Sequence, residues 1–72
     1  MKFIVFPKDE FSIFDTGNRI KIVREGTDWE VYGDTDTEAV KGMERLLSEN
    51  YNARVKISSE IDKYRGLFYA LY

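Results

Sequence analysis

The 72-residue sequence contains no cysteine and no histidine, and it has a single proline. Without cysteine the chain can form no disulfide, and without both residue types it has no zinc site of the usual Cys/His kind. A cysteine nucleophile, an imidazole base and a Ser-His-Asp triad are excluded as well. A chain this short also has little room to enclose a substrate pocket. We therefore expect a protein that is not an enzyme and needs no cofactor, metal or small-molecule substrate.

Long hydrophobic runs are also missing. No stretch approaches the roughly 18 apolar residues of a membrane-spanning helix. The first apolar run, Phe3 to Phe6, is too short for the core of a signal peptide, because proline and charged residues follow it directly. Eleven basic and thirteen acidic residues give a formal net charge of −2. These observations predict a cytoplasmic protein with no membrane partner.

Aromatic residues, by contrast, are abundant. There are eleven of them, and hydrophobic residues make up 43% of the chain, which is too apolar for intrinsic disorder. One small core cannot enclose eleven aromatic side chains, so some are expected on the surface. Exposed aromatic patches usually mark sites where a partner binds.

Short β-rich runs separated by turn residues fill the first half of the chain. Strands are predicted over residues 3–6, 11–14, 19–24 and 29–32. The segment Asp15-Thr16-Gly17-Asn18 is a strong turn signal between two of these runs. The first half is therefore expected to form an antiparallel meander, and alternation around Val55 and Ile57 predicts a further strand near residues 54–57.

One amphipathic helix is predicted over residues 36–50. Its apolar stripe follows the i, i+3, i+4, i+7 rule and comprises Ala39, Val40, Met43, Leu46 and Leu47. Thr35 and Glu38 have the spacing of a capping box at its start. Gly42 flanks the stripe and would allow the helix to approach a sheet closely. The helix would bury this stripe against the strands.

The expected fold class is α+β, with an antiparallel sheet of about four to five strands covered on one face by the helix. No linker or repeat divides the chain, so residues 1–72 are treated as one domain. The segment 59–72 fits either a helix or a strand. A helix is slightly favoured by the spacing of Ile61, Tyr64, Phe68 and Leu71, whereas Gly66 and the aromatic residues favour a strand.

Acidic residues cluster at the centre of the sequence, where five acids and no base lie between residues 28 and 38. Such a stretch could contact the basic groove of a nucleic-acid-handling protein. With the two aromatic residues among them, the candidate partner-binding residues are Asp28, Trp29, Glu30, Tyr32, Asp34, Asp36 and Glu38. A solvated acidic surface and a helix N-terminus explain the same residues, and a tryptophan in a small domain is more often part of the core. Mg²⁺ or Ca²⁺ binding by these carboxylates is a minor hypothesis that lacks the spacing of an EF-hand.

Basic residues cluster in two other segments. An alternative set of nucleic-acid-binding residues comprises Arg19, Lys21, Arg24, Arg54 and Lys56. A sequence pI near 5.0 argues against this alternative, because nucleic-acid binding usually needs a net positive field.

The residues from Gly33-Asp34-Thr35 through the helix stripe resemble the helix opening of HicB-type antitoxins. The first strand, with Lys8-Asp9-Glu10 after it, is also similar to that family, over roughly residues 1–50. The resemblance implies a small sheet with a helix packed on it, and a domain that binds and neutralises a toxin ribonuclease. In size, acidity and aromatic content the chain is also similar to phage-encoded inhibitors such as anti-CRISPR proteins.

These observations together predict a non-catalytic protein-binding module. It would inhibit a larger nucleic-acid-handling protein, such as a nuclease or CRISPR effector, through an acidic and aromatic surface. The alternatives are a nucleic-acid-binding accessory protein and a homo-oligomer, such as a homodimer, that pairs through an edge strand.

Overall fold

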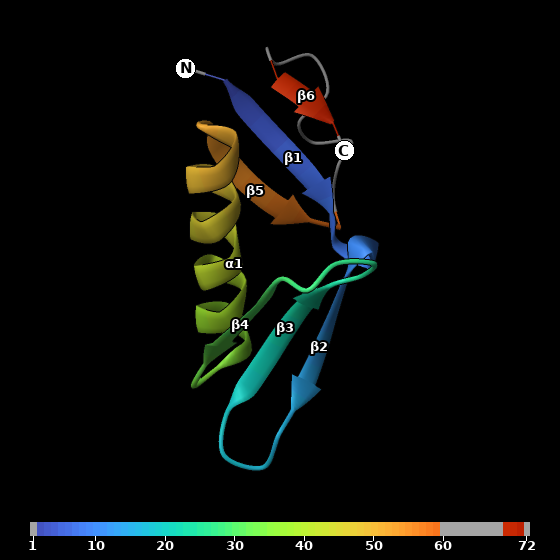
Figure 1. Ribbon diagram of the computed structural model, residues 1–72, viewed down its shortest axis with the longest axis vertical. Coiled ribbons are helices and arrows are strands. Elements are labelled where there is room, and N and C mark those ends of the chain that lie inside the picture. Colours follow the sequence, from blue (N-terminus) through green and yellow to red (C-terminus); the bar gives the residue numbers. More distant parts are fainter. Residues whose placement is uncertain (1, 60–68, 72) are drawn as a thin grey trace.

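A computed structural model describes residues 2–59 and 69–71 of the chain (Figure 1). Within these residues, six strands and one α-helix are joined by short turns and one 3₁₀ turn, η1 (Lys8–Glu10). The strands are β1 (Phe3–Pro7), β2 (Phe11–Asp15), β3 (Ile20–Arg24), β4 (Glu30–Gly33), β5 (Arg54–Ser58) and β6 (Tyr69–Leu71), and the helix is α1 (Asp36–Tyr51). The α+β class expected from the sequence is confirmed.

Strands β2, β3 and β4 form an antiparallel sheet in that order, as the meander prediction required. The β2–β3 hairpin closes at the predicted turn, where the Gly17 N–H donates to Asp15 Oδ1 at 2.8 Å. Gly17 adopts a φ of 98°, a left-handed conformation that glycine accepts without steric cost. The local turn chemistry therefore sets the register of this sheet.

Strand β1 does not join the antiparallel sheet. It lies between β5 and β6 in a second sheet and runs parallel to both. The sequence predicted one antiparallel sheet, and the strands instead divide between two sheets of three. The reason lies in β1 itself, because Ile4, Val5 and Phe6 are all buried although neighbouring residues point to opposite faces. A strand buried on both faces is typical of parallel sheets.

The end of the chain differs from the slight preference for a helix. Residues 69–71 form strand β6, which pairs with β1 in the register Phe3 to Tyr69. The segment 60–68, which contains Ile61, Tyr64, Gly66 and Phe68, lies outside the described residues. For the part that is described, the strand alternative holds.

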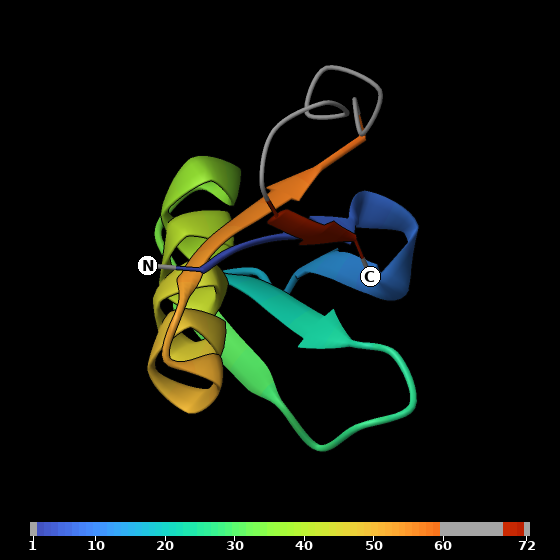
Figure 2. The ribbon, with the colours of Figure 1, turned by 90° about the horizontal axis from the view of Figure 1, so that it is seen from above.

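Helix α1 runs alongside both sheets and joins them into one core (Figures 1 and 2). Its buried residues are Ala39, Met43 and Leu47, which were all in the predicted stripe. They pack in one cluster with residues of both sheets, namely Ile4, Phe6 and Ile57 from one and Phe11 and Ile22 from the other. Gly42 lies against Val31 of β4, so the close approach predicted from this glycine is confirmed.

The start of α1 is capped as its sequence predicts. The Glu38 N–H donates to Thr35 Oγ1 at 3.2 Å, and the Asp34 N–H donates to Glu38 Oε2 at 3.1 Å. In the usual capping box the glutamate returns to the N–H of the cap residue itself. Here it reaches one residue further back, which also fixes the chain between β4 and α1.

Replacing Thr35 with alanine should lower the free energy of unfolding by about 1 kcal/mol, because the cap hydrogen bond is lost. Thermal unfolding would detect this as a midpoint roughly 4–8 °C lower. Thr35→Ser keeps the hydroxyl and should stay close to the parent chain. Thr37→Ala, at another exposed position of the same turn, is the matched control. Equal losses for Thr35→Ala and Thr37→Ala would show that the cap contributes little.

Candidate binding surface

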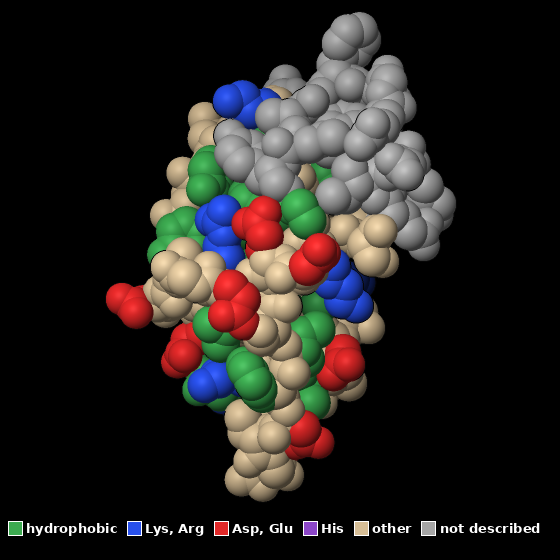
Figure 3. Space-filling model, turned by 90° about the vertical axis from the view of Figure 1, so that its right-hand side faces the viewer, with side chains coloured by type: hydrophobic (Ala, Val, Ile, Leu, Met, Phe, Trp, Pro, Cys, Tyr) green, Lys and Arg blue, Asp and Glu red, His purple; other side chains and the backbone are tan. Residues whose placement is uncertain are grey.

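The face of the β2–β3–β4 sheet that points away from α1, here called the outer face, carries a row of aromatic and basic residues. Phe14 of β2 pairs with Lys21 of β3, and Lys21 pairs with Tyr32 of β4, so the three side chains share this face. Phe14 is 49% exposed and Tyr32 is 41% exposed, and these are the exposed large hydrophobic side chains among the described residues. Figure 3 shows the side of the molecule away from α1, where hydrophobic side chains lie among acidic and basic ones.

The charges on the outer face are arranged around these rings. The Arg19 guanidinium lies 5.2 Å from the centre of the Tyr32 ring, and Lys21 Nζ lies 5.8 Å from the centre of the Phe14 ring. Lys21 also forms an ion pair with Glu30 at 3.8 Å. Each cation is thus within cation–π range of an exposed aromatic ring. The outer face combines apolar area with both signs of charge.

A groove of about 620 Å³ lies between β4 and α1, here called the β4–α1 groove. Val31, Gly33, Gly42 and Leu46 provide its apolar lining. Its charged residues are Arg19, Asp34, Glu38, Lys41, Arg45 and Glu49, and Tyr32 lines it as well. Most of the groove-lining residues on α1 are three or four positions apart, so they lie on one side of the helix. The groove therefore continues from the outer face around the open side of β4.

The candidate acidic residues follow the chain from the turn before β4 into the start of α1, and all of them are exposed. The register places Glu30 and Tyr32 on the outer face, while Asp34 and Glu38 line the β4–α1 groove. Asp28 lies in the preceding turn and Asp36 in the first turn of α1. Among residues 2–59 and 69–71, no three carboxylates are grouped closely enough to hold a metal ion.

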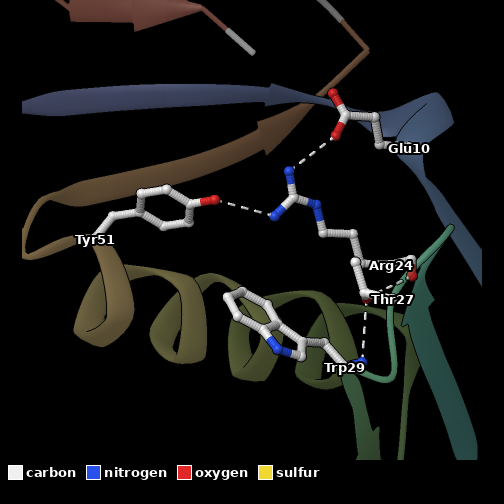
Figure 4. A network of polar contacts seen from close by, with 5 residues as sticks. All are labelled: Glu10, Arg24, Thr27, Trp29 and Tyr51. Atoms are coloured by element: carbon white, nitrogen blue, oxygen red, sulfur yellow. Dashed lines mark hydrogen bonds and ion pairs between the residues drawn. The ribbon is translucent and has the colours of Figure 1, made fainter.

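Trp29 lies in a different environment from the acids around it. Its side chain is half-buried and packs against the core. Its backbone N–H donates to Thr27 Oγ1 at 3.1 Å, and Thr27 Oγ1 donates to the Arg24 carbonyl oxygen at 2.8 Å (Figure 4). Most of this side chain is therefore committed to the fold, which leaves Tyr32 as the more exposed aromatic of the candidate set.

Arg24 is partly buried where η1, β3 and the end of α1 meet (Figure 4). Its guanidinium donates to Tyr51 Oη and to Glu10 Oε1, each at 3.3 Å. It also lies 4.8 Å from the centre of the Phe6 ring and 5.8 Å from that of Trp29. Burial lowers the pKa of Arg24, but the hydrogen bonds to Tyr51 and Glu10 outweigh it, so the pKa lies above its ordinary value. The Arg24 guanidinium is therefore occupied by contacts within the fold.

The structure separates the five basic residues of the alternative set. Arg19 and Lys21 lie together at the outer face, whereas Arg24 is partly buried and contacts Glu10 and Tyr51. Arg54 and Lys56 are exposed on β5 in the other sheet, where Arg54 lies 5.9 Å from the centre of the Phe3 ring. Of these five, Arg19 and Lys21 are the ones that contact the exposed aromatic rings found among the described residues.

Sequence reasoning did not single out Phe14, Lys41, Arg45 or Glu49 as site residues. An aromatic surplus was evident, but alternation in residues 11–14 could not show which face would be covered. The three helical residues lie outside the predicted apolar stripe, and their four-residue spacing places them on one side of the helix. Their position beside β4 depends on how the helix packs, which local spacing does not determine.

Comparison with known protein families, curated proteins and solved structures found no match to this chain. No helix within the described ranges, 2–59 and 69–71, has the length and apolar character needed to cross a bilayer. The function must therefore be inferred from the surfaces described above.

Proposed function

We propose that this chain is a non-catalytic protein-binding module whose contact surface is the outer face together with the start of α1. The observation that carries this proposal is the exposure of Phe14 and Tyr32 on one face, on either side of Lys21. Exposing two large aromatic rings to water costs free energy. A partner that covers them recovers this free energy. Aromatic residues of this kind dominate the binding energy of protein interfaces.

The acids beside these rings indicate the character of the partner. Glu30 lies on the same face as Tyr32. Asp34 follows between β4 and α1, and Asp36 and Glu38 lie in the first turn of α1. A basic partner surface would neutralise them and would be attracted over a distance. Proteins that handle nucleic acids present such surfaces to phosphates. The module would inhibit its partner by occupying that surface, which is also what the sequence resemblance to HicB-type antitoxins and anti-CRISPR proteins would imply.

Reversing the charge of Asp34 and Asp36 tests this proposal. The double substitution Asp34→Lys/Asp36→Lys should weaken partner binding roughly tenfold or more, because two attractive contacts become repulsive. The measurement is quantitative capture from an extract of the source organism, with the parent and variant chains as bait and mass spectrometry as readout. A protein enriched by the parent chain should be lost from the variant.

Asp9→Lys is the matched control for the two single variants Asp34→Lys and Asp36→Lys, because it makes the same change in net charge as each of them at an exposed site in η1. Circular dichroism of all variants checks that the fold is kept. If the control loses the partner equally, net charge rather than this surface governs binding. Unchanged capture by Asp34→Lys/Asp36→Lys would contradict the proposal.

A second candidate function is nucleic-acid binding by the outer face. Arg19 and Lys21 lie beside exposed rings of the kind on which bases stack. The same double variant separates the two candidates. Lysines in place of Asp34 and Asp36 would strengthen binding to a nucleic acid, whereas they would weaken binding to a basic protein.

A further inference from the structure

Strand β4 has an edge that no other described strand covers, since the sheet order is β2–β3–β4. The Arg24 N–H donates to the Trp29 carbonyl oxygen at 3.1 Å, and Val31 pairs with Ile22 two residues further on. Hydrogen-bonded pairs alternate along antiparallel strands. Trp29, Val31 and Gly33 therefore turn their backbone groups toward β3, whereas Glu30 and Tyr32 turn theirs toward the open edge.

The space beside this edge suits an added strand. On one side lies the outer face, with the Glu30 carboxylate and the Tyr32 ring. On the other side lies the β4–α1 groove, whose lining includes Val31 and Leu46. Side chains of an added strand would alternate between these two environments. The Glu30 carboxylate is paired with Lys21 but remains 47% exposed, so it can accept a second cation, whereas Val31 and Leu46 favour apolar groups in the groove.

A second copy of this chain is a poor occupant of the edge. Antiparallel pairing of β4 with itself, centred on Val31, would place Asp28 opposite Asp34 of the other copy. Like charges directly opposite destabilise a strand pair, and the segment 28–38 has no base to offset them. The same charges favour a strand that carries lysine or arginine at alternate positions.

We propose that β4 recognises an extended basic segment of its partner by adding it as a fourth, antiparallel strand to the antiparallel β2–β3–β4 sheet. This inference rests on the proposed protein-binding function and specifies how the partner is held. Backbone hydrogen bonds to Glu30 and Tyr32 give affinity, as in other cases where a peptide joins a sheet edge. Basic side chains opposite these residues meet the Glu30 carboxylate and the Tyr32 ring, and the intervening apolar side chains enter the groove.

A capped seven-residue peptide of alternating lysine and valine serves as the probe. Titration into the ¹⁵N-labelled chain should shift the amide signals of Glu30 and Tyr32. Methylation of the lysine backbone nitrogens removes the donors that face β4, so affinity should fall roughly tenfold or more. Methylation of the valine nitrogens is the matched control, because those N–H groups point away from β4, and binding should persist. A peptide of alternating glutamate and valine should not bind.

Unshifted Glu30 and Tyr32 amides would overturn the inference, as would equal affinities for the two methylated peptides. On the protein, Glu30→Pro removes one N–H from the open edge, where proline is tolerated, and Glu30→Ala controls for the lost carboxylate. Weaker peptide binding by Glu30→Pro than by Glu30→Ala is expected, and equal binding would contradict edge pairing.

The failure of this inference can be told apart from failure of the proposed function. If the peptide leaves β4 unshifted but Asp34→Lys/Asp36→Lys still loses its protein partner, the proposed function stands without edge pairing. If the peptide pairs with β4 while that variant keeps its partner, the edge binds strands but the acidic contact is wrong.

Discussion

Replacing Arg24 with alanine is expected to lower the free energy of unfolding by about 2–4 kcal/mol. A domain of this size has a total stability of roughly 4–10 kcal/mol, so the variant would lose a large fraction of it. The loss is large because one guanidinium contacts Glu10, Tyr51 and the ring of the fully buried Phe6. Its removal takes the ion pair from Glu10 and one hydrogen bond from Tyr51 at the junction of the two sheets.

Urea denaturation would measure this effect as a lower midpoint at an unchanged slope. Arg24→Lys should retain part of the stability, because it keeps the charge but loses the planar group that reaches both partners. Arg19→Ala is the matched control, since Arg19 is exposed and contacts the outer face. A loss for Arg24→Ala no larger than that for Arg19→Ala would mean that the junction does not depend on this side chain.

Replacing Gly33 with alanine should cost about 2–3 kcal/mol, which is in the range of overpacked cores. A β-carbon at Gly33 would lie 2.6 Å from the Ala39 nitrogen and 3.0 Å from the Glu38 carbonyl carbon. Both are backbone atoms at the start of α1, so the helix itself would have to move away from β4. The same shift would disturb the cap and the β4–α1 groove.

Gly42→Ala is the comparison for this variant, and thermal unfolding measures both. The added β-carbon at Gly42 would lie 2.6 Å from a methyl group of Val31, which is a side chain and not the backbone. Alanine also favours the helix by about 1 kcal/mol over glycine, which offsets part of the clash. We expect Gly33→Ala to lose clearly more stability than Gly42→Ala. The reverse order would show that β4 adjusts less readily than the helix.

The elements of this fold that depend on neighbouring residues could be predicted from the sequence. The stripe of α1, its Thr35 cap and the β2–β3 turn all follow from spacing over a few residues. The separation into two sheets could not be predicted in this way, because β1 pairs with strands from the far end of the chain. The consecutive apolar residues Ile4, Val5 and Phe6 did carry a signal, since they implied burial on both faces.

The candidate surface, like the fold, could be predicted only in its local features. Exposure of the acids followed from their charge, and a surplus of aromatic rings followed from their number. Arg24 shows why the remainder was not predictable. In sequence it is one of several basic residues in a strand, and its partly buried position depends on Glu10 and Tyr51, which are distant in the sequence. Contacts between residues distant in the sequence decide whether a charged side chain stabilises the fold or lies on the surface.

The position of β1 has a consequence for how the protein folds. Phe3 pairs with Arg54 and with Tyr69, so β1 must wait until the last strands of the chain are available. The β2–β3–β4 sheet needs only local loops to close and can form earlier, because short loops cost less entropy. During synthesis, β1 would emerge before its partners β5 and β6 and would stay unpaired while the β2–β3–β4 sheet forms. Until β1 pairs, its apolar residues are a site for chaperones or for aggregation.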